Sequence, residues 1–258
     1  MSILHIIDRS RVWVAFCAAS MYAEFVLLTH IPISLLQLLQ VFFFTWAAYL
    51  FLDGDKAFAK KWTIPTAATG SLFLGTFNFS HEWQIWFLCG ALVLLYHRDV
   101  FGKNKFSLPF DLRSNAAIKT ITIATAWTLL TSVWPAMPVL ATNYTDLLPL
   151  IISNFFFVAA LSLTEDICDS GIDVSSTFAT KIGTAKTKWI AVLATVAACI
   201  FFHIFNDQLI NTLAAVVYAV MVLVILFIIT RKSQSTSGWV PLAIDGFFML
   251  RFVLVLSL

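Results

Sequence analysis

Charged side chains are scarce in this chain of 258 residues. Asp, Glu, Lys and Arg make up 12% of the sequence, about half of their usual share of ~25% in soluble proteins. Apolar residues reach 60%, and the mean hydropathy is +0.89. A soluble domain of this size cannot bury so much apolar surface and still cover itself with polar groups. The composition therefore excludes a soluble globular protein, a disordered chain and a nucleic-acid-binding protein, and it predicts an integral membrane protein.

Cysteine is also rare, with four residues in the whole chain. These four show no spacing typical of a metal site, and their number excludes a disulfide-stabilised scaffold. The chain must therefore be held together by packing in lipid and by its few polar groups.

Long apolar runs are the main feature of the sequence. A transmembrane β-strand needs about ten residues of alternating polarity, whereas these runs are continuous and approach the ~20 residues that cross a bilayer as a helix. We predict an all-α integral membrane protein that contacts the lipid bilayer through nine transmembrane helices. The predicted spans are about residues 12–29, 33–52, 64–79, 82–95, 116–137, 147–164, 189–205, 209–230 and 239–258.

The basic residues predict the orientation of these spans. Fourteen of the sixteen lie in the segments on the N-terminal side of the membrane, and the other two, Lys119 and Arg251, lie within spans. Cytoplasmic loops collect Lys and Arg. We therefore expect a cytoplasmic N-terminus and a multi-pass protein of the bacterial inner membrane, with its functional groups facing the cytoplasm.

Acidic residues gather on the same side in two clusters. Asp53 and Asp55 close the second predicted span, and Asp166, Asp169 and Asp173 close the sixth. On a helix the last three fall within about 60° of one another, so their like charges repel and their desolvation adds to the cost. A divalent cation offsets that cost, and ligands that are all oxygen suit Mg²⁺. The alternative is that these acids are solvated loop residues or balance the nearby bases.

The two clusters are related in topology, because the second and sixth spans both run from outside to inside. The separation between Asp53 and Asp166 is 113 positions (166 minus 53). A parallel internal repeat of about four helices would give both this separation and the shared direction of the two spans. We predict a single transmembrane domain over residues 1–258, with helices 1–4 and 5–8 as a possible repeat and a ninth helix after them.

The second acidic cluster carries a resemblance to a known family. Asp166-Ile167-Cys168-Asp169 is followed by Asp173, and the segment from Thr177 to Gly183 reads T-F-A-T-K-I-G. This region resembles the UbiA superfamily of intramembrane prenyltransferases, in which D-x-x-D-x-x-x-D precedes T-L-x-x-x-x-G. The segment 115–138, which contains Lys119, is also similar to the fifth span of the family. The resemblance implies a UbiA-like helical bundle around a central cavity.

The first acidic cluster departs from the family pattern. An N-D-x-x-D-x-x-x-D motif would place acids at positions 53, 56 and 60, but here Asp53 is followed by Lys56 and Lys60, with Asp55 out of phase. The first metal half-site is therefore either formed by Asp53 and Asp55 or weakened. Lys56, Lys60 and Lys61 are candidate ligands of a diphosphate.

The resemblance implies a membrane-embedded Mg²⁺-dependent enzyme that ionises an isoprenyl diphosphate and transfers the prenyl group to a lipophilic acceptor. The implied metal ligands are Asp53, Asp55, Asp166, Asp169 and Asp173. The last three are the expected catalytic residues together with Lys119, which would be an added contact to the diphosphate. The alternative for Lys119 is a lysine whose ammonium extends to the membrane edge. Asn154 in the sixth span and Asp245 in the ninth are further candidates for substrate binding. The oligomeric state is left open.

Two alternatives remain at this point. The Y-S-x-x-K-R loop of family members with aromatic acceptors is missing, since positions 96–98 read Tyr-His-Arg. This favours a UbiA-type terpene cyclase, in which the prenyl diphosphate cyclises on itself, as the second hypothesis. The third is a secondary transporter, which would place its main charges near the bilayer midplane.

Two charges within spans predict a structural contact. Glu24 and Arg251 each lie about twelve residues from the inner start of their spans. Their equal depth permits an ion pair that joins the first and ninth helices.

Overall fold

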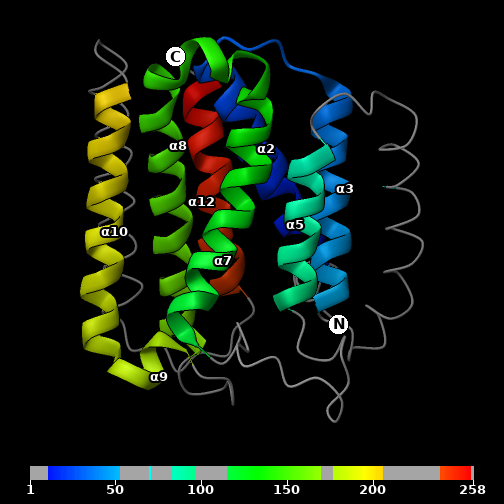
Figure 1. The fold of residues 1–258 in the computed structure, drawn as a ribbon. Helices are drawn as coiled ribbons and strands as arrows, with labels where there is room; N and C mark the ends of the chain where they lie inside the picture. The colour runs from blue at the N-terminus through cyan, green and yellow to red at the C-terminus, as the bar shows by residue number, and fades with distance from the viewer. Residues whose placement is uncertain are drawn as a thin grey trace. The chain divides into compact units, whose positions relative to one another are not determined.

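The computed structural model describes residues 11–52, 70, 83–96, 115–169, 177–205 and 239–256. These residues are predominantly helical and contain no strand (Figure 1). Within them, four helices are long and apolar enough to cross a membrane: Leu35–Leu52, Ala116–Leu140, Asn143–Cys168 and Thr184–Phe205. The prediction of an all-α chain is confirmed for this part of the sequence, and these four helices are candidates for membrane spans.

Seven of the predicted spans coincide with described helices. Five of these are α2 (Val12–Leu28), α3 (Leu35–Leu52), α5 (Trp83–Tyr96), α10 (Thr184–Phe205) and α12 (Trp239–Leu256). The spans expected near 64–79 and 209–230 lie outside the described residues. The count of nine, the orientation and the single-domain arrangement therefore stay predictions.

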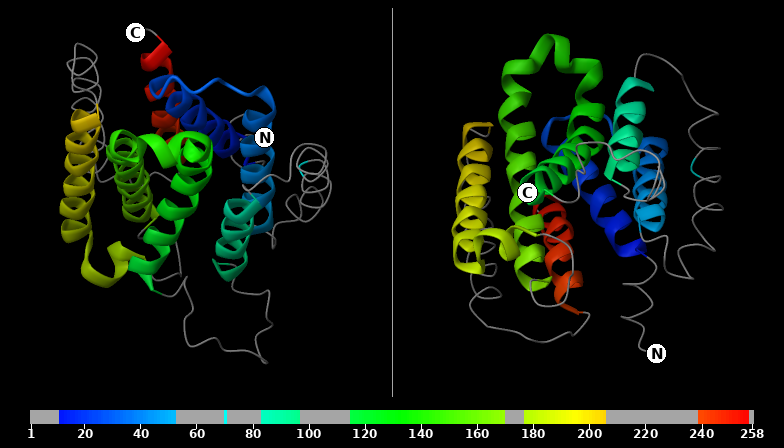
Figure 2. Two further views of the ribbon diagram at one scale, coloured as in Figure 1. Left: turned by 45° about the horizontal axis from the view of Figure 1, so that its top comes forward. Right: turned by 60° about the horizontal axis from the view of Figure 1, so that its bottom comes forward.

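The other two spans come from one continuous stretch of helix. It begins with α7 (Ala116–Thr128), passes through a π-helical turn, η1 (Leu129–Val133), and continues as α8 (Trp134–Asp169). Inside α8, Asn143 departs from helical geometry with φ −124° and ψ 28°. The chain reverses direction there, as Figure 2 shows, so that α7 and the second part of α8 run antiparallel. The sequence predicted the two spans but not the π turn.

The chain forms two compact units. The first unit contains Met1–Gly90, Leu129–Pro138 and Ser237–Leu258. Its central helix is α2, of whose seventeen residues twelve are buried, and which packs against α3, α12 and η1. Small side chains let neighbouring helices approach a membrane helix closely. On α2 the buried alanines are Ala15, Ala18, Ala19 and Ala23.

An ion pair joins α2 to α12 inside this unit. Arg251 donates from Nη2 to Glu24 Oε1 at 2.6 Å and from Nε to the same oxygen at 3.0 Å. Both side chains are only 3% exposed. The pair that the equal depths of Glu24 and Arg251 predicted is confirmed. A charge in an apolar interior is tolerated only beside its counter-charge, so this pair specifies how α12 meets α2.

A chain of aromatic rings links the remaining helices of the first unit. Phe44 of α3 contacts Trp86 of α5 edge-on, with ring centroids 5.1 Å apart. Trp86 in turn contacts Trp134, at 4.6 Å, and Trp134 lies 6.1 Å from Tyr22 of α2. The Tyr22 hydroxyl donates to Gln37 Oε1 at 2.7 Å. Edge-to-face pairs of this kind add to the stability that burial alone provides.

The second unit contains Ala91–Thr128 and Val139–Thr236. Its described helices include α7, most of α8, the short α9 (Phe178–Ile182) and α10. Ser153 Oγ on α8 donates to the carbonyl oxygen of Ala198 on α10 at 2.8 Å, and Phe156 stacks on Phe201 with centroids 5.9 Å apart. An interhelical hydrogen bond and a ring contact thus connect α8 with α10.

Large apolar side chains point outward on several helices. Phe87 on α5 is 71% exposed, and Trp189 and Leu193 on α10 are 70% and 65% exposed. A soluble protein rarely exposes so many large apolar side chains together. Their exposure is consistent with contact between these helices and the acyl chains of a bilayer.

Replacing Glu24 by Gln should destabilise the protein strongly, because it leaves the buried Arg251 guanidinium without its counter-charge. Breaking one side of a buried pair costs about 3–5 kcal/mol. In the double variant Glu24→Gln with Arg251→Met both charges are gone, and we expect it to recover a large part of that loss. Thermal unfolding of the detergent-solubilised chain measures both effects.

The matched control for that comparison is Asp146→Asn, which removes an exposed carboxylate. It should leave the unfolding temperature unchanged. Equal unfolding temperatures for Glu24→Gln and wild type would show that the pair is not a determinant of the packing of α12.

Candidate functional site

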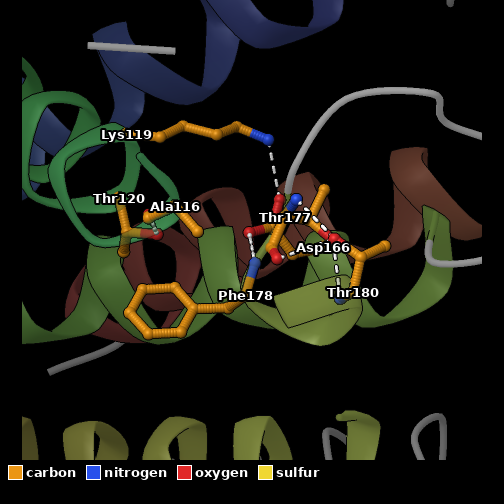
Figure 3. A network of polar contacts seen from close by, with 7 residues as sticks. All are labelled: Ala116, Lys119, Thr120, Asp166, Thr177, Phe178 and Thr180. Carbon is orange, nitrogen blue, oxygen red and sulfur yellow. Dashed lines mark hydrogen bonds and ion pairs between the residues drawn. The ribbon is translucent and has the colours of Figure 1, made fainter. Parts of the chain in front are cut away.

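The site is formed around an ion pair between two antiparallel helices. Lys119 lies in the first turn of α7, and Asp166 lies in the last turn of α8. Because the chain reverses at Asn143, these two turns meet at the same end of the unit. Lys119 Nζ donates to Asp166 Oδ1 at 2.7 Å (Figure 3). A charge-assisted hydrogen bond of this length is among the stronger polar contacts in proteins.

Both partners are largely removed from solvent. The Asp166 side chain is 4% exposed and that of Lys119 is 16% exposed. Tyr96 at the end of α5 and Glu165 also lie near enough to Lys119 to interact with its charge. The ammonium group is therefore held chiefly by Asp166, and only a small part of the Lys119 side chain is accessible to solvent.

The second oxygen of Asp166 faces the start of α9. The backbone N–H of Phe178 donates to Asp166 Oδ2 at 3.4 Å, a long contact (Figure 3). The first N–H groups of a helix have no partner within the helix. One carboxylate thus connects α7, α8 and α9.

The structure explains the T-F-A-T-K-I-G motif from Thr177 to Gly183. Thr177 caps α9: its Oγ1 accepts from the Thr180 N–H at 3.2 Å, and Thr180 Oγ1 accepts from the Thr177 N–H at 2.8 Å. This is a capping box. Gly183 ends α9 with φ +90° and ψ 148°, a conformation that is nearly restricted to glycine. α10 begins at the next residue, so this glycine forms the corner between the two helices.

The structure brings part of the predicted site together. Lys119 and Asp166, both predicted as catalytic, are in direct contact. Asp169 is the last residue of α8, one turn beyond Asp166, and its side chain is outside the described set. The remaining predicted residues of the acidic and basic clusters also lie outside the described residues: Asp53, Asp55, Lys56, Lys60, Lys61 and Asp173.

The two other candidates for substrate binding lie elsewhere. Asn154 is buried on α8, twelve residues before Asp166, which is about 18 Å along a helix at 1.5 Å per residue. Its neighbour Ser153 bonds to α10, so Asn154 is placed in the packed part of the helix and not beside the ion pair. Asp245 lies on α12, in the first unit, and its side chain is not described.

The donor chemistry of the site fits a hard divalent cation. Among the described residues no group of three His, Cys, Asp or Glu side chains lies close enough to hold a metal. Within the described residues, however, Asp166 Oδ2 has one long contact and keeps accepting capacity, and Asp169 follows one helical turn later on the same helix. Carboxylate oxygens are the ligands that Mg²⁺ prefers.

Sequence reasoning missed two features of this site. It assigned Lys119 to a diphosphate and Asp166 to a metal, and it did not pair them. It took Thr177 and Gly183 as parts of a family motif, without the capping role of Thr180. The signal for that role was present, because a Thr three residues after a Thr and three before a Gly is a pattern that closes a short helix at both ends.

No model of a known protein family matches the chain, and neither a curated protein nor a solved structure shows significant similarity to it. The resemblance around residues 165–183 therefore rests on the sequence motif alone. Any activity assigned to the Lys119–Asp166 site is a proposal supported by its chemistry.

Replacing Gly183 by Ala should destabilise the chain by about 1–3 kcal/mol, because a side chain is strained at this backbone conformation. The matched control is Gly90→Ala within α5. Apart from its own chain neighbours and helix backbone, neither glycine has an atom within 4 Å of the position of an added Cβ, so no clash with another part of the chain contributes to either substitution. Gly90→Ala should be neutral or stabilising by up to about 1 kcal/mol.

Thermal unfolding of the two variants in one detergent measures the difference. A Gly183→Ala protein as stable as Gly90→Ala would contradict the strained corner between α9 and α10.

Proposed function

We propose that this protein is a membrane-embedded, Mg²⁺-dependent enzyme that ionises an isoprenyl diphosphate and transfers the prenyl group to a lipophilic acceptor. The observation that carries the proposal is the Lys119–Asp166 contact. It places a cationic side chain, suited to phosphate, beside an acidic helix end with the donor chemistry for a divalent cation. Both occur at one end of apolar helices, where a substrate with a charged head and an apolar tail would lie.

Each described residue has a distinct task in this proposal. The Lys119 ammonium would donate hydrogen bonds to a diphosphate oxygen and so stabilise the negative charge that forms as the allylic C–O bond breaks. Asp166 and Asp169 would hold the cation, together with Asp173. When bound, that cation would neutralise the negative charge of the diphosphate leaving group.

This chemistry also requires that water be excluded, and the surrounding helices are apolar. An allylic cation that meets water is quenched, so the prenyl chain must react in a dry environment. Between Asn154 and Asp166, α8 carries buried apolar residues such as Phe157 and Leu161. A prenyl chain that extends along the helices from the ion pair would be shielded in this way.

Cyclisation of the prenyl chain on itself is the second candidate. It is favoured by one feature of the sequence, the Tyr-His-Arg at 96–98 in place of the family's loop for aromatic acceptors. Both activities share the ionisation step and differ only in the nucleophile that meets the cation. Incubation with a prenyl diphosphate and no acceptor distinguishes them, since a cyclic hydrocarbon or terpene alcohol as the main product would favour the cyclase.

Replacing Asp169 by Asn should abolish Mg²⁺-dependent diphosphate release while leaving the fold intact. The amide keeps the size of the side chain but removes its charge and most of its affinity for Mg²⁺. Release of pyrophosphate from a prenyl diphosphate measures the loss, and thermal unfolding verifies the fold.

Asp146→Asn is the matched control, since this exposed acid lies near the turn at Asn143, far along α8 from the ion pair. It should retain full activity. An Asp169→Asn protein with wild-type activity would refute the proposed role of this carboxylate.

A further inference from the structure

Lys119 and Asp166 bind each other in this structure, whereas the proposed function assigns Lys119 to the diphosphate and Asp166 to the divalent cation. We propose that this ion pair is a lock on the empty site. The pair separates when a diphosphate and a divalent cation bind together, because each ligand then takes one of its two charged groups. The ammonium of Lys119 passes to the diphosphate, and the carboxylate of Asp166 passes to the cation. The inference rests on the proposed function, because it assumes that a diphosphate and a divalent cation are the ligands of this site.

Burial of the pair is the reason that neither ligand can open it efficiently alone. The Asp166 side chain is 4% exposed and the Lys119 side chain 16%. Among the described residues, the carboxylate is compensated by the Lys119 ammonium, and the ammonium is compensated chiefly by that carboxylate. A diphosphate that takes the ammonium deprives the buried carboxylate of this partner. A divalent cation that takes the carboxylate leaves an ammonium that it repels. Only the two ligands together leave every charge compensated.

The contact between Asp166 and α9 extends this exchange to the backbone. Asp166 Oδ2 accepts from the N–H of Phe178, and the capping box at Thr177 holds the rest of the α9 start. A change of partner at Asp166 therefore alters one of the contacts that position α9. The cap within α9 does not depend on Asp166, so the short helix itself is retained.

The exchange predicts that the two ligands bind cooperatively. Inorganic pyrophosphate and Mn²⁺ are suitable probes, because Mn²⁺ shares the oxygen preference of Mg²⁺ and its free concentration is measured by electron paramagnetic resonance. For the full-length wild-type chain in detergent, we expect pyrophosphate to tighten Mn²⁺ binding by roughly tenfold or more, within the range of typical coupling between sites. Mn²⁺ bound by pyrophosphate in the absence of protein is measured separately and subtracted.

The decisive variant is Lys119→Met, which opens the lock without any ligand. Asp166 then has no ammonium to displace, so Mn²⁺ alone should bind about tenfold more tightly than it does to wild type. The cooperativity with pyrophosphate should fall to about twofold or less. Lys119→Arg keeps a cation that can pair with Asp166 and should behave as wild type.

Lys186→Met is the matched control for charge. Lys186 is an exposed lysine in the first turn of α10, in the same unit, so its removal changes the net charge by the same amount without opening the pair. Mn²⁺ affinity should rise by less than about twofold in this variant. If Lys186→Met and Lys119→Met strengthen Mn²⁺ binding equally, general electrostatics explains the effect and the lock is refuted.

Two outcomes separate the lock from the proposed function. If wild type binds Mn²⁺ and pyrophosphate independently, the exchange is wrong while the proposed enzyme remains possible. If wild type binds neither probe, alone or together, the proposed function fails and the lock fails with it. Should Lys119→Met not fold, the cooperativity measured in wild type and in Lys119→Arg still decides the question.

Discussion

A charge inside an apolar bundle must meet its counter-charge, and the described part of this chain satisfies that constraint twice. In the first unit Glu24 and Arg251 pair across 227 positions of sequence. In the second unit Lys119 and Asp166 pair across 47 positions. Each contact determines which helices are neighbours and at what height, because a shift by one residue would separate the charges. In a chain with so few charges, these pairs carry much of the information that specifies packing.

The two pairs differ in their surroundings, and this difference indicates that the first pair stabilises the fold whereas the second is accessible to a ligand. Glu24 and Arg251 lie in the interior of α2 and α12, nearly without exposure. Lys119 and Asp166 lie in terminal turns, beside Glu165, the end residue Asp169 and the capped start of α9. A ligand with a charged head can approach groups at a helix end, whereas an ion pair in the packed middle of a bundle acts on stability. The site proposal therefore rests on the second pair alone.

Much of the described fold was predictable because hydropathy alone determines where an apolar helix crosses a membrane. The limits of α2, α3, α5 and α12 agree with the predicted spans within a few residues. α10 begins at Thr184, five residues before the predicted start, because its beginning depends on the positive φ of Gly183, a conformation that hydropathy does not report.

The candidate site was predictable only in part. The Glu24–Arg251 pair followed from equal depth in two helices that run in the same direction, since only one height had to match. The Lys119–Asp166 pair was not predicted, because its formation depends on the turn at Asn143, which brings the two helix ends together. Separate roles had been assigned to the two residues from their types and motif positions. Residue types indicate what a side chain can bind, whereas contacts decide what it binds when no ligand is present.

The central claim is that the acidic helix end beside Lys119 binds a prenyl diphosphate together with a divalent cation and promotes loss of the diphosphate. Its most direct test is to incubate the purified chain with geranyl, farnesyl and geranylgeranyl diphosphates, with Mg²⁺ or with a chelator, and to measure the pyrophosphate released. The account predicts release from at least one of these substrates that requires Mg²⁺ and stops when the chelator is added. No release from any of them, or release that is unaffected by the chelator, would contradict it.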